Sequence, residues 1–329
     1  MRTLNGIFPY ANTIVCIEDS KLLKQFQYDI LYNTPDLRTA LDELNKVNYF
    51  RTYENADTKN YAAILDGLME DTFELIRNIT PTELIWRIFA LYYDIHNMKL
   101  VAKERFSGNR LDRLAISYGS YSLPTIRSAA VRESDNILEN VTLTEGFFEA
   151  LRAKEMYDID FILDKTYFRT LRKLAGEMGV PAIIGFVIEK TDLFNISMLT
   201  QSWAAWRPTG YFLRAFSDQG SCTLKDWEPF IDKEPIEVEK FELWKKYLPI
   251  WEAARDRRQL FEELDVHVDN YLVEKTKACK LMAFGIEPIC AYFFNKFIEI
   301  KNIRILLTGK DYNYSTYEIQ RRMRKPYEL

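Results

Sequence analysis

Glycine and proline are scarce in this sequence. Together the 12 glycines and 11 prolines make up about 7% of the 329 residues, where an average protein has about 12%. Sheet proteins with many tight turns depend on these residues, because glycine adopts left-handed backbone angles and proline fixes φ. Their scarcity argues against a turn-rich all-β fold and predicts an all-α protein.

Cysteine and histidine are also few. There are four cysteines with no CxxC spacing, and two histidines, His96 and His267. These numbers argue against a disulfide framework and a zinc cluster. Glycine-rich phosphate loops and the HExxH and GxSxG motifs are absent as well. The sequence therefore predicts no catalytic residue, no metal ligand and no cofactor.

Charge of one sign and long apolar runs are lacking too. Lys and Arg total 44 against 48 Asp and Glu, so the net charge is -4 and no basic excess would hold a polyanion. We therefore expect no nucleic-acid partner. The apolar stretches VPAIIGFVIEK and TELIWRIFALYYDI are short or carry charges, and the first residues lack the apolar region of a signal peptide. We expect an unprocessed, cytoplasmic chain that does not span the membrane.

One short pattern is present in three copies: an acid, two residues, an asparagine and then mostly apolar residues. The copies are DIHNMKLVAKER from Asp94, DLFNISMLTQSW from Asp192 and EIKNIRILLTGK from Glu299. Their spacings of 98 and 107 residues indicate internal triplication. The acid and asparagine positions are Asp94 and Asn97, Asp192 and Asn195, and Glu299 and Asn302.

A proline upstream of each copy predicts where its helix begins. Pro81, Pro181 and Pro288 precede the acids by 13, 11 and 11 residues, and proline is tolerated in the first turn of a helix. We predict a central, largely buried helix from each proline, with the acid and the asparagine one turn apart on one face. Three capping boxes are predicted as well: Thr80 with Glu83, Thr142 with Glu145, and Ser315 with Glu318.

The three copies predict three helical repeat domains, residues 1–115, 116–219 and 220–329. The connections between these domains are predicted near residues 114–124 and 216–226, where small and turn-forming residues gather. TPDLRTAL from Thr34 aligns without a gap with TEGFFEAL from Thr144, while the third repeat has only the weak match TLKDWEPF. YAAILDGLMEDTFELIRNI has the three-four apolar spacing of an amphipathic helix.

The motif acids allow two interpretations. Three carboxylates could converge as an acid–base or metal cluster, because hard cations prefer oxygen ligands. The interpretation we favour is structural, since copies related by a threefold rotation occupy equivalent local places. Each asparagine would then bond to backbone at a helix bend or contact within its own repeat. His96 lies inside the first copy, but Phe194 and Lys301 replace it in the others, so we predict an ordinary helix residue.

Two further groups could form surfaces. The basic end RRMRK contains Arg321, Arg322, Arg324 and Lys325; it fits a solvated helix end favoured by the helix dipole, or a contact with acidic loops or lipid headgroups. Large aromatics either pack in a core or anchor a partner. Five tryptophans lie close in sequence: Trp203, Trp206, Trp227, Trp244 and Trp251.

Several stretches of the sequence belong together: FPYANTIVCIEDSKLL, TPDLRTALDEL, TEGFFEALRAKE, LDKTYFRTL, GIEPICAYFFNKFIEIKNIRILLTGK and IQRRMRKPYEL. Together they resemble one known family, the C subunits of bacterial and archaeal V/A-type ATPases, whose eukaryotic counterpart is the d subunit. The similarity runs from about residue 6 to the end and is most specific in its C-terminal part. Pro229 and Pro235 depart from the pattern at the start of the third repeat.

This resemblance implies a funnel-shaped protein of three homologous helical domains around a pseudo-threefold axis, with no active site of its own. In that family the protein is a rotor socket. Its concave side receives the central shaft made of the D and F subunits, and its other side rests on the cytoplasmic face of the membrane proteolipid ring. It would transmit torque between ATP turnover and the transport of protons or sodium ions. A general helical scaffold for protein interactions is the alternative that repeated helices leave open.

Overall fold

The structure is a computed structural model that describes residues 8–50, 53, 56–132, 138–204, 210–231, 245–250, 260–282 and 284–326. These residues form helices joined by turns and contain no strand, which confirms the predicted all-α class. The chain divides into two compact units. One combines Met1–Pro81 with Pro249–Leu329, and the other is Thr82–Leu248.

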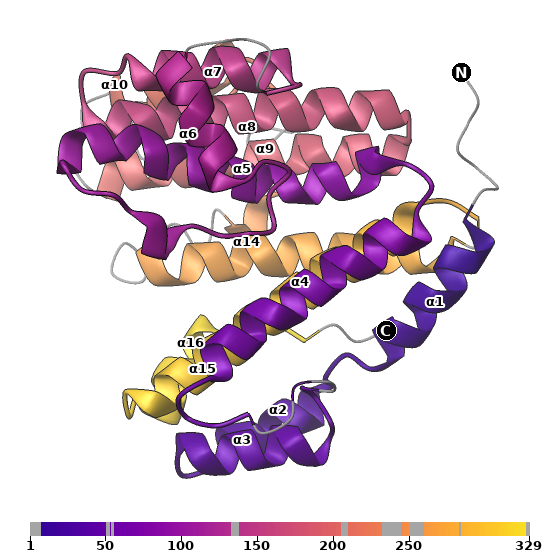
Figure 1. Ribbon diagram of the computed structural model, residues 1–329. Coiled ribbons are helices and arrows are strands. Elements are labelled where there is room, and N and C mark those ends of the chain that lie inside the picture. Colours follow the sequence, from indigo (N-terminus) through magenta and orange to yellow (C-terminus); the bar gives the residue numbers. More distant parts are fainter. Residues whose placement is uncertain are drawn as a thin grey trace. The chain divides into compact units, whose positions relative to one another are not determined.

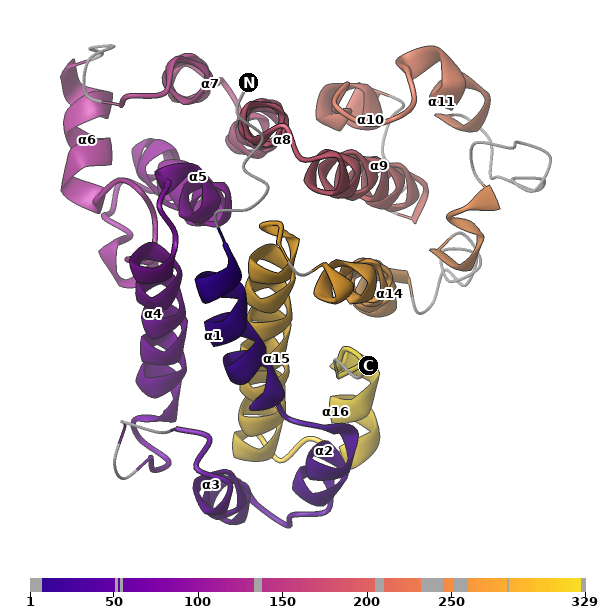
Figure 2. The ribbon, with the colours of Figure 1, turned by 90° about the vertical axis from the view of Figure 1, so that its right-hand side faces the viewer.

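The first unit is built around the long helix α15 (Glu287–Asp311), which Figure 2 shows among α1, α4 and α14. Apolar residues occur all around α15, and its contacts with several helices leave most of its length buried. The ring of Phe293 on α15 meets that of Phe73 on α4 edge to face, with centroids 4.8 Å apart. The other elements of this unit are α1 (Pro9–Ser20), α2 (Gln25–Tyr32), α3 (Leu37–Lys46), α4 (Tyr61–Ile79), α14 (Leu260–Lys277), the 3₁₀ helix η3 (Ala278–Leu281) and α16 (Thr316–Arg322).

The second unit has α8 (Met156–Met178) at its centre, in contact with α5, α7, α9 and α10 (Figure 1). Phe168 of α8 packs on Phe194 of α9, with ring centroids 4.7 Å apart. Both α5 and α8 end at a glycine with positive φ, Gly108 and Gly179. The other elements are α5 (Glu83–Ser107), the 3₁₀ helix η1 (Asp112–Leu114), α6 (Leu123–Arg132), α7 (Val141–Leu151), α9 (Pro181–Ala204), α10 (Gly210–Ala215) and α11 (Leu224–Ile231).

The predicted central helices are present as α5, α9 and α15. Helix α9 begins at Pro181, and α15 carries Pro288 in its first turn, as predicted. The capping box at Thr80 is wrong. Thr82 caps α5 through a bond from the Leu84 amide, while the Thr80 hydroxyl donates to Ile76 O at the end of α4.

The other two capping boxes have opposite outcomes. Thr142 lies inside α7, whose cap is Asn140, so the prediction at Thr142 is wrong. Asparagine is a strong N-cap residue, and here it accepts from the Leu143 amide. The box formed by Ser315 and Glu318 at the start of α16 is confirmed in both directions.

Helices recur along the chain at the predicted spacing. Helix α6 begins 98 residues after α2, and α9 begins 98 residues after α5. The aligned stretches TPDLRTAL and TEGFFEAL overlap α3 and α7, and the predicted amphipathic segment is α4. The division into domains 1–115, 116–219 and 220–329 stays a prediction, because compactness of a unit does not test homology between segments.

Candidate functional site

The three motif asparagines make the same pair of hydrogen bonds. Each side-chain amide donates to a backbone carbonyl and accepts from the backbone N–H of the same residue, at distances of 2.7 to 3.0 Å. Each asparagine thus bonds to backbone, but Ile116, the partner of Asn97, lies in the predicted second repeat and so outside the predicted repeat of Asn97. The partner residues follow by 19, 22 and 22 positions: Ile116 for Asn97, Ser217 for Asn195 and Arg324 for Asn302.

The three motif acids also share one contact. Each is buried and accepts a hydrogen bond from a backbone N–H that precedes a short helix. The donors lie 3.0, 2.8 and 2.6 Å away: Tyr121 for Asp94, Ser221 for Asp192 and Leu23 for Glu299. Two donors follow their acids in sequence, but Leu23 precedes Glu299 by 276 residues.

Leu23 nevertheless lies where the predicted repeat would place the equivalent of Tyr121. Tyr121 lies 98 residues after Leu23, the same spacing that separates Asn97 from Asn195. Each acid thus reaches from one predicted repeat to the beginning of the next, and the last acid reaches the beginning of the first. The segment containing α2 joins the end of the chain to its start within the first unit.

Two ion pairs follow the same pattern, and one of them joins a residue near the end of the chain to a helix near its start. Lys99, two residues after Asn97, pairs with Asp164 of α8 at 2.6 Å. Arg304, two residues after Asn302, pairs with Asp66 of α4 at 2.6 Å. Asp164 lies 98 residues after Asp66, so the two pairs join equivalent helices. Arg304 of α15 thus contacts α4 as Lys99 of α5 contacts α8.

Glycines allow two of the acids to approach the backbone closely. A methyl group on Gly119 would overlap with Asp94 Oδ1, and one on Gly220 would overlap with Asp192 Oδ1. These glycines therefore belong to the acid-binding turns. Neither has a positive φ, so steric room and not backbone angle explains them.

Gly220→Ala is expected to lower the free energy of unfolding by about 1–3 kcal/mol, because the new methyl group must displace a buried carboxylate. Gly185 in α9 is the matched control, since nothing lies within 4 Å of its added methyl group. Gly185→Ala should stabilise by about 0.5–1 kcal/mol. Urea unfolding of both variants tests this, and equal effects would contradict the proposed crowding.

The three acids differ in how their charge is balanced. Burial raises the pKa of the Asp94 carboxyl from its ordinary value of 3.8 to about 6, against the opposing effect of hydrogen bonds from Tyr121 and Ser120. Asp192 accepts from the hydroxyl groups of Ser221 and Tyr247 at 2.6 and 2.7 Å, and Lys246 Nζ lies 3.7 Å away. This set compensates a buried carboxylate more fully.

Glu299 is balanced by a buried lysine. Lys296, one turn before it on α15, pairs with Glu299 Oε2 and lies 4.9 Å above the ring centroid of Tyr49. Farther along α15, Lys310 donates to the backbone carbonyls of Tyr32 and Thr34. The side chains of α15 thus hold the N-terminal segment at several points by charge-assisted hydrogen bonds.

The motif acids accept hydrogen bonds from backbone amides at three separate turns. Within the described residues, no group of three or more His, Cys, Asp or Glu side chains could hold a metal ion. Each acid has its own backbone donor: Tyr121 for Asp94, Ser221 for Asp192 and Leu23 for Glu299. The geometry offers a repeated joint between helices and not a shared acid–base centre.

The basic residues after α16 have different surroundings. Arg324 is 6% exposed and pairs with Asp269 at 2.7 Å, so it is removed from the predicted contact residues. Arg321 and Arg322 are half-buried beside tyrosine rings, and Lys325 is exposed.

Residues 11–322 match the family described as the ATP synthase (C/AC39) subunit. This chain belongs to that family. It is 24% identical to the C subunit of the V-type sodium ATPase of Enterococcus hirae, over 97% of this chain and 98% of that protein. It is 22% identical to the C subunit of the A-type ATP synthase of Methanocaldococcus jannaschii, over 95% of this chain and 85% of that protein. The resemblance identified from the sequence is confirmed.

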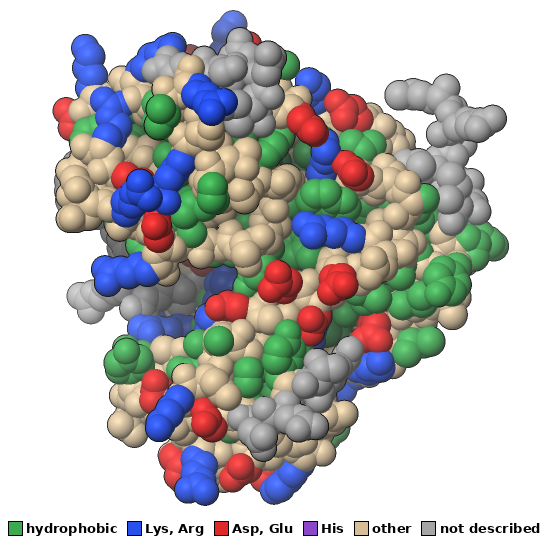
Figure 3. All heavy atoms as spheres, viewed as in Figure 1, with side chains coloured by type: hydrophobic (Ala, Val, Ile, Leu, Met, Phe, Trp, Pro, Cys, Tyr) green, Lys and Arg blue, Asp and Glu red, His purple; other side chains and the backbone are tan. Residues whose placement is uncertain are grey.

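In this member of the C/AC39 family, no helix in the described part of the chain is long and apolar enough to cross a membrane. Hydrophobic side chains do gather at the surface over α1, at the right of Figure 3. There Tyr10 and Ile17 are 74% and 54% exposed.

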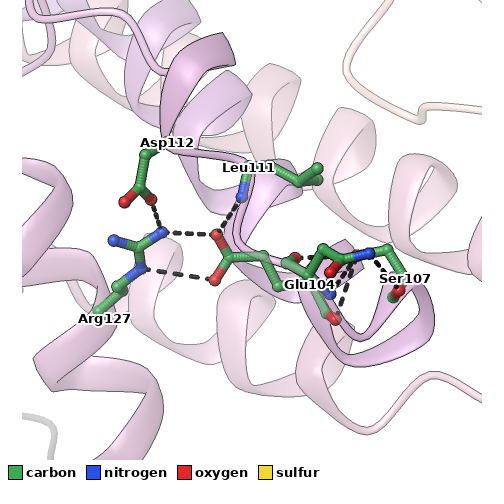
Figure 4. A network of polar contacts seen from close by, with 6 residues as sticks. Glu104, Ser107, Leu111, Asp112 and Arg127 are labelled. Atoms are coloured by element: carbon green, nitrogen blue, oxygen red, sulfur yellow. Dashed lines mark hydrogen bonds and ion pairs between the residues drawn. The ribbon is translucent and has the colours of Figure 1, made fainter.

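A network that the sequence did not reveal fixes the turn after α5 in this C/AC39 protein (Figure 4). Arg127 of α6 lies between Glu104 of α5 and Asp112 of η1 and bonds to both. The hydrogen bond from Arg127 lowers the pKa of Asp112. Glu104 also accepts from the Leu111 amide at 2.9 Å. The network connects α5, η1 and α6 on either side of the turn that supplies Ile116 to Asn97.

The remaining candidates fit ordinary packing. His96 Nε2 lies 2.9 Å from the carbonyl oxygen of Leu114. Trp227 is fully buried against Phe212 and Phe216. The side chains of the other four clustered tryptophans lie outside the described residues.

Proposed function

We propose that this chain is the non-catalytic rotor socket of a V/A-type rotary ATPase. Its three predicted repeats would surround a pseudo-threefold axis and form a funnel. The concave side would hold the shaft made of the D and F subunits, and the other side would rest on the cytoplasmic face of the membrane proteolipid ring. The chain would transmit torque between ATP hydrolysis or synthesis and the transport of protons or sodium ions.

The cyclic order of the buried contacts supports this proposal. A coupler must pass rotation on without being twisted itself, and rigid joints serve that purpose. The acids join helices α5, α9 and α15 to the turns at Tyr121, Ser221 and Leu23. The asparagines join the same helices to the backbone of Ile116, Ser217 and Arg324. Membership of the C/AC39 family identifies the kind of machine in which such a part would work.

We propose that the basic end of the chain contacts the ring. Arg321, Arg322 and Lys325 remain candidates, whereas Arg324 is held by Asp269. Long cationic side chains at an interface rim guide and orient association with acidic loops.

Copurification tests the proposed function. The chain, tagged and expressed at its natural level, should be isolated from solubilised membranes together with shaft and ring proteins and with ATPase activity. The isolated chain should hydrolyse no ATP. Recovery with cytosolic proteins alone, or ATPase activity of the isolated chain, would lead us to abandon the rotor assignment.

A further inference from the structure

The turn that follows α5 carries three arginines that no acid pairs with. Arg105, Arg110 and Arg113 are exposed, and within the described part of the chain none of them forms a hydrogen bond or an ion pair. Two apolar side chains, Phe106 and Leu114, are 38% and 50% exposed. We call these five residues the arginine turn. In Figure 3, basic side chains gather at the left, over the end of α5 and η1.

The two acids of this region are already neutralised. Glu104 and Asp112 both bond to Arg127 of α6, and Glu104 also accepts from the Leu111 amide (Figure 4). The hydrogen bond from Arg127 lowers the pKa of Asp112, and the charge of Arg110 adds to this effect. With Arg127 included, four arginines stand against two acids, so the local charge is positive.

The turn is fixed by its own hydrogen bonds. The Ser107 hydroxyl donates to Asn109 O at 3.0 Å, and the Asn109 side-chain amide donates to Ser107 O at 3.2 Å. Between them Gly108 has a φ of 67°, which glycine adopts without strain. Such a turn loses little conformational freedom when its arginines bind an anionic surface.

We propose that the arginine turn binds a membrane surface of anionic lipid headgroups. Each arginine close to such a surface strengthens binding about fivefold. Apolar side chains beside the cations add to binding when they enter the boundary between headgroups and acyl chains. Phe106 follows Arg105 and Leu114 follows Arg113, so an exposed apolar side chain stands beside both outer arginines.

The arrangement favours a lipid surface over an acidic protein. The three arginines come from the last turn of α5, the connection after it and η1, so they do not share one helix face. A protein partner would need an acid at the matching place for each arginine, whereas mobile headgroups can gather around cations at any spacing. Residues 105–114 also contain no tyrosine or tryptophan, the residue types that together with arginine most often anchor protein interfaces.

The test uses the full chain and protein-free phosphatidylcholine vesicles with or without phosphatidylglycerol, with binding measured by sedimentation. The chain should bind the phosphatidylglycerol vesicles about tenfold or more tightly, and binding should weaken as the salt concentration rises. Arg110→Gln/Arg113→Gln should bind these vesicles about tenfold or more weakly than the original chain. Leu114→Ser should bind them about threefold or more weakly, because it removes apolar surface that leaves water on binding.

Arg169→Gln/Lys173→Gln is the matched control. It removes the same charge from exposed positions of α8 in the same unit, and residues 169–177 expose no large apolar side chain. This variant should bind the phosphatidylglycerol vesicles as the original chain does. Circular dichroism should show unchanged helicity and melting for all the variants.

The inference does not rest on the proposed function, because it concerns lipid binding by the isolated chain. It is overturned if the original chain does not prefer phosphatidylglycerol, or if Arg110→Gln/Arg113→Gln binds as before. Equal losses in the two double variants would assign binding to net charge alone and overturn it as well. If the chain ignored protein-free vesicles and the arginine substitutions weakened its binding only to membranes that hold the ATPase complex, the arginine turn would belong to an acidic protein partner and not to lipid.

Discussion

Glu299→Ala should lower the free energy of unfolding by about 3–5 kcal/mol, the cost of breaking a buried ion pair by removing one partner. Lys296 and Glu299 are 8% and 4% exposed at their side chains. The substitution leaves the lysine charge buried and removes the acceptor of the Leu23 amide. Both losses affect the joint between α15 and the N-terminal segment, so urea unfolding should show a lower midpoint.

A pair with the same spacing in the same unit provides the control. Lys277 and Glu274 on α14 are 36% and 69% exposed at their side chains. Exposed pairs contribute little, so Glu274→Ala should change the free energy of unfolding by less than about 0.5 kcal/mol. If Glu299→Ala cost no more than this control, the joint would not depend on its buried charge.

The contact between Glu299 and Leu23 differs from those of Asp94 and Asp192, because its two sides are not consecutive in the chain. The turns that bind Asp94 and Asp192 are covalently continuous with the helices that carry those acids. The turn at Leu23 reaches Glu299 from the other end of the chain and is held by non-covalent contacts, which include those of Lys296 and Lys310. If the chain transmits torque as proposed, this is the place where twisting would open it first. Buried charges make such an opening costly.

The sequence could predict the helices and the motif, but not the contact between Glu299 and Leu23 that joins the end of the chain to its start. Periodicity locates α4, and the repeated amide in apolar surroundings predicts that each asparagine has backbone partners. Leu23 carries no such signal, because it donates through its backbone, and an amide N–H is the same in every residue but proline. Its equivalence to Tyr121 becomes visible only when the contacts are known.

The two wrong capping boxes have a common physical cause. A box pattern records that two side chains are able to cap a helix, but neighbouring residues compete for the same position. Thr80 completes the last turn of α4, so Thr82 takes the cap of α5. Asn140 precedes Thr142 and is the N-cap of α7, because it accepts the hydrogen bond from the Leu143 amide. Asn313 stands two residues before Ser315, but it has a positive φ and lies in the turn after α15, so Ser315 takes the cap and its box forms.

Asp94→Asn should become progressively more stabilising, relative to the original chain, as the pH rises from about 4 to 7. Because the pKa of Asp94 is about 6 in the folded chain and ordinarily 3.8, the folded state holds the proton more tightly. Ionisation above pH 6 then costs the folded state about 3 kcal/mol, at 1.36 kcal/mol for each pKa unit. Asparagine keeps an oxygen for the Tyr121 amide and cannot ionise, so it avoids this cost.

The measurement is the difference in free energy of unfolding between variant and original chain at several pH values, in which all other titrating groups cancel. Asp36→Asn is the control with the opposite sign. The hydrogen bond from the Thr39 amide lowers the pKa of Asp36, the exposed cap of α3, so its carboxylate stabilises the fold above pH 4 and this contribution is lost on acidification. Asp36→Asn should therefore lower the free energy of unfolding, relative to the original chain, by more as the pH rises. A difference for Asp94→Asn that is flat between pH 4 and 7 would mean that the hydrogen bonds to the buried Asp94 carboxylate already compensate its burial.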